Sequence, residues 1–191
     1  MKRIKILFVE DDPDFIFLIN SLLQNDQELE VLGYSDKKDE AIALAEKLKP
    51  DIVLMDLNLS MGEFDGIEAA KQIRLKTDAK VILLTAFEQP EISVDASKKS
   101  FASGYIYKSQ YEILSDTIKS TANGRTPQED FINALILSEL STAEKYIFNL
   151  MLGKGGQVLS SEKTIANQKT NIFKKLGIKN SNELRHIFKG M

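Results

Sequence analysis

The sequence predicts an α/β fold in which a doubly wound, five-stranded parallel sheet precedes a second, small all-α domain. Within residues 1–122, five short apolar runs alternate with five segments whose apolar residues recur at helical spacing, as in a sheet with crossover helices. The later residues show helical spacing only. Charge changes at the same place, because residues 1–122 carry 15 basic and 22 acidic side chains and residues 123–191 carry 10 and 6. We therefore expect two domains with different partners.

The strands and helices alternate regularly along the chain. Ile4–Val9 is short and apolar and ends on acids, and Pro13 suits the first turn of the helix after it. Ser35 or Asp36 is placed to cap the second helix. The predicted strands are Ile4–Val9, Glu30–Tyr34, Ile52–Asp56, Lys80–Ala86 and Gly104–Lys108. The first predicted helix starts at Pro13. The other four cover Ala41–Leu48, Gly66–Leu75, Glu91–Phe101 and Tyr111–Ala122.

Polar side chains occur where these strands end. Asp56 ends the third strand, and a single acid there is usually only a polar terminus. Glu10 and Asp11 follow the first strand, however, and Thr85 and Lys108 end the fourth and fifth. The carboxyl ends of parallel strands meet at one edge, where ligands bind. Three acids raise one another's pKa unless a cation neutralises them, and oxygen ligands favour Mg²⁺. Beside that ion Asp56 could attack a phosphoryl group, with Lys108 and Thr85 offsetting its charge.

Composition excludes several classes of protein. The chain has no Cys, which rules out disulfides and suits the cytoplasm, and its one His, His186, rules out catalysis by several histidines. No apolar run approaches the ~20 residues of a membrane span, and the first residues do not read as a signal peptide. A hydrolase would need a base beyond the acids already used. We expect no membrane partner and no dedicated enzyme.

Four motifs at the strand ends resemble those of bacterial two-component response regulators, over Lys2 to about Ala122. They are Val9–Pro13, Leu54–Asn58, Leu84–Ala86 and Gly104–Ser109, and their order and spacing carry the resemblance. It implies a flavodoxin-like receiver that takes a phosphoryl group from a histidine kinase with the help of Mg²⁺. The implied roles are Mg²⁺ binding by Glu10, Asp11, Asp56 and the Asn58 main-chain carbonyl, phosphoryl acceptance by Asp56 with Thr85 and Lys108, and switching by Thr85 and Tyr105.

Two features depart from that family. The loop Leu59–Gly66 has Ser60 where proline is usual and is longer than common, so we expect it to change partner choice or access to Asp56. Phe87 is apolar at a position that influences dephosphorylation in the family. Our hypothesis is that Phe87 hinders the attacking water and lengthens the phosphorylated lifetime.

Beyond residue 122 the sequence predicts a linker and a small helical domain. Turn formers and charges over Asn123–Asp130 indicate the linker, and Phe131–Leu140 reads as a helix. Ser141 and Glu144 have the spacing of a capping box, and a later helix ends at Gly177 as a left-handed cap. The predicted parts are a receiver at 1–122, a linker with a helix at 123–139 and a helical domain at 140–191.

The helical domain resembles the NarL/LuxR-type helix-turn-helix in Leu140–Glu144, Ser161–Gln168 and Asn171–Gly177. Residues 141–191 carry 9 basic and 3 acidic side chains, as a surface that contacts DNA phosphates would. The resemblance makes Glu162–Leu176 the recognition helix. It places Ala166, Asn167 and Thr170 at base edges and Lys163, Lys169 and Lys174 at phosphates, with Asn167 the strongest candidate for reading adenine.

One helix of that family is missing from the pattern. A scaffold helix normally lies between Gly153 and Ser161, but the seven residues Lys154–Ser160 include two adjacent glycines and cannot form three turns at 1.5 Å per residue. Either the motif is degenerate, or residues that belong there are absent; the join at Thr126 and Pro127 could hide a similar omission.

Two functions therefore remain open. The first is a phosphorylation-controlled DNA-binding transcription regulator that forms a homodimer. The second is a receiver that acts through protein–protein contacts and carries a degenerate, non-DNA-binding output domain. Salt-dependent binding to a duplex separates them, because only the first releases counterions from DNA.

Overall fold

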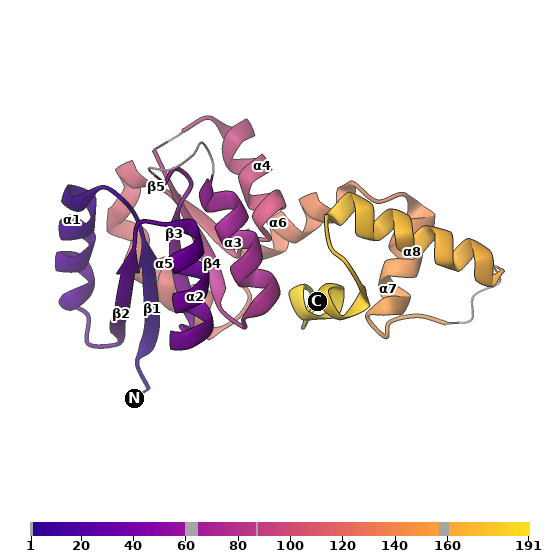
Figure 1. The fold of residues 1–191 in the computed structure, drawn as a ribbon, viewed down its shortest axis with the longest axis horizontal. Coiled ribbons are helices and arrows are strands. Elements are labelled where there is room, and N and C mark those ends of the chain that lie inside the picture. The colour runs from indigo at the N-terminus through magenta and orange to yellow at the C-terminus, as the bar shows by residue number, and fades with distance from the viewer. Residues whose placement is uncertain (1, 60–64, 87, 157–160) are drawn as a thin grey trace. The chain divides into compact units, whose positions relative to one another are not determined.

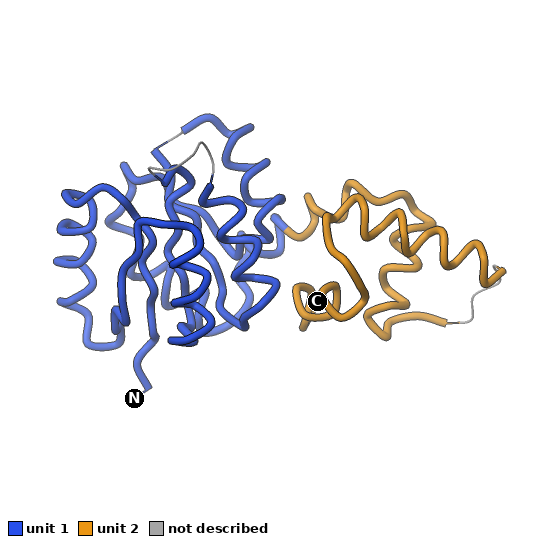
Figure 2. The backbone as a smooth tube through the Cα atoms, viewed as in Figure 1, with its two compact units in different colours: residues 1–132 blue, residues 133–191 orange. Residues whose placement is uncertain are grey.

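The computed structural model describes residues 2–59, 65–86, 88–156 and 161–191. The chain forms two compact units, residues 1–132 (unit 1) and residues 133–191 (unit 2), which Figure 2 colours separately. The predicted boundaries at residues 122 and 140 stay predictions. Within the described ranges, every helix is too short or too polar to cross a lipid bilayer.

Unit 1 is built on an all-parallel, five-stranded sheet with the order β2-β1-β3-β4-β5 (Figure 1). Its strands are β1 (Ile4–Val9), β2 (Leu29–Ser35), β3 (Ile52–Asp56), β4 (Lys80–Thr85) and β5 (Gly104–Tyr107). β3 lies at the centre and is buried along its whole length, as its unbroken apolar run predicts. The predicted doubly wound sheet is confirmed.

Helices cover both faces of this sheet. Because successive side chains of a strand point to opposite faces, Val53 and Met55 of β3 pack on one side and Ile52 and Leu54 on the other. The first side is covered by α2 (Lys38–Leu48), α3 (Asp65–Lys76) and α4 (Pro90–Ser100), and the second by α1 (Pro13–Gln24) and α5 (Leu114–Asn123). Figure 1 shows α2 and α3 in front of the sheet. These layers leave the carboxyl ends of the strands side by side at one edge of the sheet.

The start of α2 differs from the prediction. Neither Ser35 nor Asp36 caps it: the N-cap is Lys37, whose side chain makes no capping bond. The Ser35 hydroxyl instead donates to the Lys37 carbonyl and accepts the Lys37 N–H, which closes a local turn before the helix.

Two later helices also start at other residues than predicted. The fifth helix begins at Leu114 and is preceded by a 3₁₀ segment, Lys108–Ile113, within which Gln110 departs from helical backbone angles. The helix predicted at Phe131 begins earlier, as α6 (Pro127–Ser138), within the expected linker. Pro127 suits its first turn, and the Thr126 hydroxyl accepts the Glu129 N–H at 3.1 Å.

Unit 2 contains α7 (Thr142–Met151), α8 (Glu162–Leu176) and α9 (Ser181–Ile187). The predicted capping box is confirmed: Ser141 Oγ accepts the Glu144 N–H at 3.3 Å, and the Glu144 carboxylate accepts the Ser141 N–H at 2.7 Å. Lys175 Nζ donates to the same carboxylate at 2.7 Å and so joins α7 to the last turn of α8. Gly177 ends α8 with a φ of 63°, as predicted.

The segment between α7 and α8 contains no helix in its described residues, 152–156 and 161. Gly153 and Gly155 have positive φ angles of 79° and 144°, which a helix does not allow. Whether the motif is degenerate or residues are absent from this segment stays an open alternative. Residues 157–160 lie outside the described part, as do Ser60 and Phe87, so the hypotheses about those two residues stay predictions.

Candidate functional site

The ends of β1, β3 and β5 bring two acids and one ammonium group into contact. Lys108 Nζ lies 2.8 Å from Glu10 Oε1 and 3.2 Å from Asp56 Oδ2. These residues are 98 and 52 positions apart in the chain, so the order of the strands assembles the cluster. Both acids are buried, with Glu10 1% and Asp56 6% exposed.

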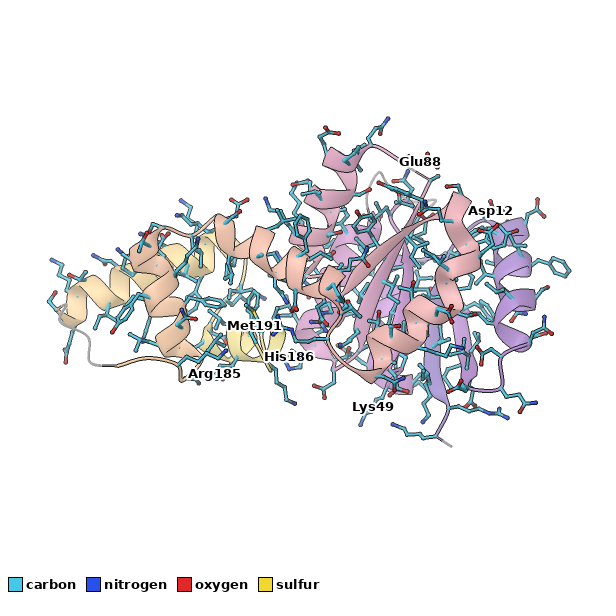
Figure 3. All side chains as sticks on the ribbon, turned by 180° about the vertical axis from the view of Figure 1, so that it is seen from behind. Asp12, Lys49, Glu88, Arg185, His186 and Met191 are labelled. Carbon is cyan, nitrogen blue, oxygen red and sulfur yellow. The ribbon has the colours of Figure 1, made fainter. Side chains whose placement is uncertain are left out.

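This cluster lies at one end of unit 1. Asp12, which follows β1, and Glu88, which follows β4, mark that end in Figure 3, whereas Lys49, which precedes β3, lies at the opposite end. Asp12 caps α1 by accepting the Asp14 N–H at 2.9 Å. Its own N–H donates to Glu10 Oε1 at 3.2 Å, which helps to fix the buried acid.

The charges of the cluster are unbalanced. Burial raises the pKa of Glu10 from 4.5 to about 7, although the Lys108 hydrogen bond opposes that rise. Burial also raises the pKa of Asp56, against the charge of Lys108 and a hydrogen bond from the Asn58 main chain. Burial lowers the pKa of Lys108, but its bonds to the two acids outweigh this and leave that pKa raised. One ammonium faces two carboxyl groups, so a further positive charge is needed to keep both ionised.

A metal ion held by Glu10, Asp11 and Asp56 would supply that positive charge. One carboxylate oxygen from each lies within 4.8 Å of the others. Glu10 Oε2 is buried and lies 2.7 Å from Lys108 Nζ, the same ammonium group that contacts Asp56. A cluster of three carboxylates, whose negative charge is offset in part by one ammonium group, fits a hard cation such as Mg²⁺.

The predicted switch residues lie on the two neighbouring strands. Thr85 is the last residue of β4, is 1% exposed, and is in register with Tyr107 of β5. Tyr105 lies two positions before Tyr107, is half-buried, and packs its ring 5.8 Å from the Tyr107 ring. The structure brings Glu10, Asp56 and Lys108 into contact and places Asp11 within 4.8 Å of the two acids; the roles of all the predicted site residues stay predictions.

Gly66 fixes the end of β3 from the side of α3. Its N–H donates to the Leu57 carbonyl at 3.2 Å, and a Cβ at this position would collide with the main-chain carbonyl of Asp56. The missing side chain therefore lets the first turn of α3 cover the main chain that carries Asp56.

The profile of the response regulator receiver domain matches residues 6–118, which include all of these strand ends. The chain belongs to the response regulator family. The response regulator protein VraR of Staphylococcus aureus is 32% identical over 196 aligned positions, which cover 92% of this chain and 91% of VraR. The alignment has 196 positions, more than the 191 residues of this chain, although part of the chain lies outside it. VraR therefore has residues within the aligned region that have no counterpart in this regulator.

Solved structures place the regulator in the LuxR group. A LuxR-family two-component response regulator from Aurantimonas sp. SI85-9A1 is 28% identical, with a TM-score of 0.60 over 72% of this chain and 98% of that one. The RcsB response regulator of Salmonella typhimurium is 23% identical and shares the fold, with a TM-score of 0.59 over 96% of this chain and 97% of RcsB. This protein is a two-component response regulator of the LuxR type.

The sequence reasoning missed one residue of the receiver site. The ring of Phe15 in α1 lies 4.7 Å from Lys108 Nζ and packs edge-on against Phe8, 6.4 Å between ring centres. An aromatic face attracts an ammonium group and so helps to hold Lys108 between the acids. In the sequence Phe15 is one of several apolar residues on its helix, so nothing there distinguishes it.

The predicted DNA-contacting residues of this regulator divide into two groups on α8. Lys163, Ala166, Asn167, Thr170 and Lys174 are exposed and follow helical spacing along one face, whereas Lys169 is half-buried. The Thr170 hydroxyl donates to the Ala166 carbonyl at 3.1 Å. The buried face of α8, through Ile172 and Leu176, packs within unit 2. The exposed face is thus free of core packing, while Lys169 points toward the packed side.

Proposed function

We propose that this response regulator accepts a phosphoryl group on Asp56 from a histidine kinase and that this controls DNA binding by unit 2. The observation that carries the proposal is the buried pair of Glu10 and Asp56 around a single ammonium group, Lys108. A protein gains no stability from two buried acids with one cation, so a functional role for the arrangement is favoured.

The cluster suits acyl phosphate formation. The bond between phosphorus and the donor histidine nitrogen breaks, that nitrogen keeps the electron pair, and an Asp56 carboxylate oxygen forms the new bond. Lys108 offsets negative charge on the phosphoryl oxygens, and the Thr85 hydroxyl is proposed to donate to one of them. Glu10, Asp11, Asp56 and the Asn58 carbonyl would hold Mg²⁺, which supplies further neutralising charge when bound.

The output is proposed to be sequence-specific DNA binding through α8. Its exposed face carries Lys163 and Lys174 for phosphates, and Asn167 with Ala166 and Thr170 for base edges. Lys169 is retained as a phosphate contact in the proposal, although it is half-buried here. Phosphorylation would favour a homodimer, which matches the two-fold symmetry of many operators. We assign the chain to the cytoplasm, with no membrane partner and no role as a dedicated enzyme.

A second candidate function rests on the short connection between α7 and α8. Without a scaffold helix in its described residues, unit 2 has less support for a recognition helix than the family pattern expects. In this alternative the receiver acts through protein–protein contacts, and unit 2 does not bind DNA.

Phosphoryl transfer is tested with phosphoramidate and Mg²⁺ on the full chain, read by intact mass. We expect the wild type to gain one phosphoryl group, and Asp56→Asn to gain none because the nucleophile is lost. Asp116→Asn is the matched control, since Asp116 is an exposed acid on α5, and it should behave as wild type. Phosphorylation of Asp56→Asn would contradict the assignment.

DNA binding is tested by selection from a random-sequence duplex pool, with and without beryllofluoride and Mg²⁺. We expect beryllofluoride to strengthen binding and the affinity to fall steeply with salt, because lysines displace counterions from phosphates. Absence of any salt-dependent binding in both states would favour the protein-contact alternative.

A further inference from the structure

Helix α6 is hydrogen-bonded to the edge strand of the receiver at one residue, Tyr105. Gln128 Nε2 donates to the Tyr105 carbonyl at 3.0 Å, and Gln128 Oε1 accepts the Tyr105 N–H at 3.2 Å. In a parallel sheet the N–H and the carbonyl of one residue point to the same side of the strand. β5 is an edge strand, with β4 on one side and no described strand on the other. The N–H and carbonyl of Tyr105 point to the side without a strand. The Gln128 amide therefore takes the place that a neighbouring strand would occupy.

The backbone next to Tyr105 is shaped to admit this amide. Gly104 is buried, and a Cβ on it would lie 2.6 Å from Gln128 Oε1, too close for the amide to stay. The Gln128 side-chain oxygen thus occupies space that a side chain at position 104 would need.

The first turn of α6 is held at a second strand as well. Lys80, the first residue of β4, donates to Glu129 Oε2 at 3.0 Å and to the Gly124 carbonyl at 2.5 Å. The Glu129 side chain is 11% exposed, so this ion pair is shielded from solvent. Consecutive residues of α6, Gln128 and Glu129, are therefore fastened to β5 and β4.

We propose that Gln128 is a positioning residue for the switch: it pairs with the main chain of Tyr105 and makes α6 follow displacements of β5. This inference rests on the proposed function in one respect, that Tyr105 responds to phosphorylation of Asp56. Helix α6 spans Pro127–Ser138 and contains the boundary between the two units, so a movement of its first turn enters the segment that leads to unit 2.

The pairing itself is tested by amide hydrogen exchange, resolved by NMR on the full chain without any ligand. In Gln128→Leu we expect the Tyr105 N–H to exchange about five- to tenfold faster, the effect of one net hydrogen bond. Gln128→Glu keeps an acceptor for that N–H but no donor for the carbonyl, so its Tyr105 N–H should stay protected. Gln72→Leu is the matched control, because the Gln72 amide donates to Glu68 within α3. Equal exchange in wild type and Gln128→Leu would overturn the pairing.

Gly104→Ala provides an independent route to the same change. Its methyl group should expel the Gln128 amide and speed exchange at Tyr105 as Gln128→Leu does. In the double variant the two effects should not add, because both remove one interaction. Additive effects would show that Gly104 and Gln128 act separately and would overturn the proposal.

The coupling is tested by adding beryllofluoride and Mg²⁺ and following exchange over residues 127–138. We expect a change in the wild type and in Gln72→Leu, and its loss in Gln128→Leu even though beryllofluoride still binds by calorimetry. An unchanged response in Gln128→Leu would overturn the coupling. If the wild type binds no beryllofluoride, the proposed function and the coupling fail together, while the ligand-free exchange at Tyr105 decides the pairing on its own.

Discussion

The receiver cluster and the exposed face of α8 are built in opposite ways. Glu10, Asp56 and Lys108 come from three strand ends far apart in the chain and are held in a buried, charged contact. The α8 residues from Lys163 to Lys174 come from one helix and are mostly exposed. Groups in buried contact affect one another's energies, whereas separate exposed groups act almost independently. We therefore expect large, coupled effects of substitution in the first region and small, additive effects in the second.

The largest effect is expected from Lys108→Met without metal. It leaves two buried acids without their cation and should lower the free energy of unfolding by about 3–5 kcal/mol at neutral pH, measured by urea denaturation of unit 1. Lys119→Met is the control, because Lys119 pairs with Asp26 near the surface at 2.8 Å, and its effect on the free energy of unfolding should be much smaller. Equal losses in the two variants would remove the contrast between buried and exposed charge.

The pH dependence of unit 1 should come next in size. Glu10 has a pKa of about 7 in the folded state because it is buried, against 4.5 ordinarily. Between those values the folded state holds a proton that the unfolded state has released. The contribution of Glu10 to stability is thus full below pH 4.5 and falls as pH rises through about 7, on the order of 3 kcal/mol in total.

Urea denaturation of the metal-free protein across this range measures the slope. Glu10→Gln should reduce it, since no proton is then exchanged at that position, and the raised pKa of Asp56 should leave a smaller slope. Added Mg²⁺ should restore stability at the alkaline end, because it favours the ionised acids. A slope in Glu10→Gln as steep as in the wild type would place its origin elsewhere.

A smaller effect is expected at the capping box of unit 2. Lys175 and the Ser141 N–H lower the pKa of Glu144, so its charge stabilises the fold above pH 4.5 and the contribution is lost as pH falls below that. Glu144→Gln should cost about 1 kcal/mol at neutral pH, read from exchange of the α7 amides in the full chain. Glu162→Gln, an exposed acid in the first turn of α8, should leave those amides unchanged.

The smallest effects are expected on the face of α8. Lys163→Ala should weaken binding uniformly across duplex sequences and reduce the salt slope by about 1. Asn167→Ala should instead relax preference at one base pair and leave the slope unchanged. Binding of both variants to the selected duplex and to a scrambled one separates the two outcomes. A sequence-dependent loss in Lys163→Ala would show that the α8 residues do not act independently.

The strands could be predicted from the sequence, because buried parallel strands are continuous apolar runs. The acid cluster could be predicted as well, because the carboxyl ends of parallel strands share one edge of the sheet. β3 shows this, since its run Ile52–Met55 and the terminal Asp56 are found as predicted. The capping box at Ser141 and Glu144 was also predictable, because it depends on residues three positions apart.

Contacts between distant parts of the chain were not predictable from local patterns. Phe15 meets Lys108 only because α1 packs beside the strand ends, and its helical spacing resembles that of any core residue. Gln128 lies in a segment of turn formers that reads as a linker, yet its amide completes the edge of β5. Both depend on distances that spacing along the sequence does not contain.

Gly66 has a consequence for how this regulator can diverge. The loop that precedes it is one of the two places where the sequence was predicted to depart from its family, and α3 begins at Asp65. Because Gly66 seats the helix on the strand backbone without an intervening side chain, a change in loop length before it need not displace Asp56. The loop sequence can therefore vary while the carboxylate at the end of β3 keeps its place.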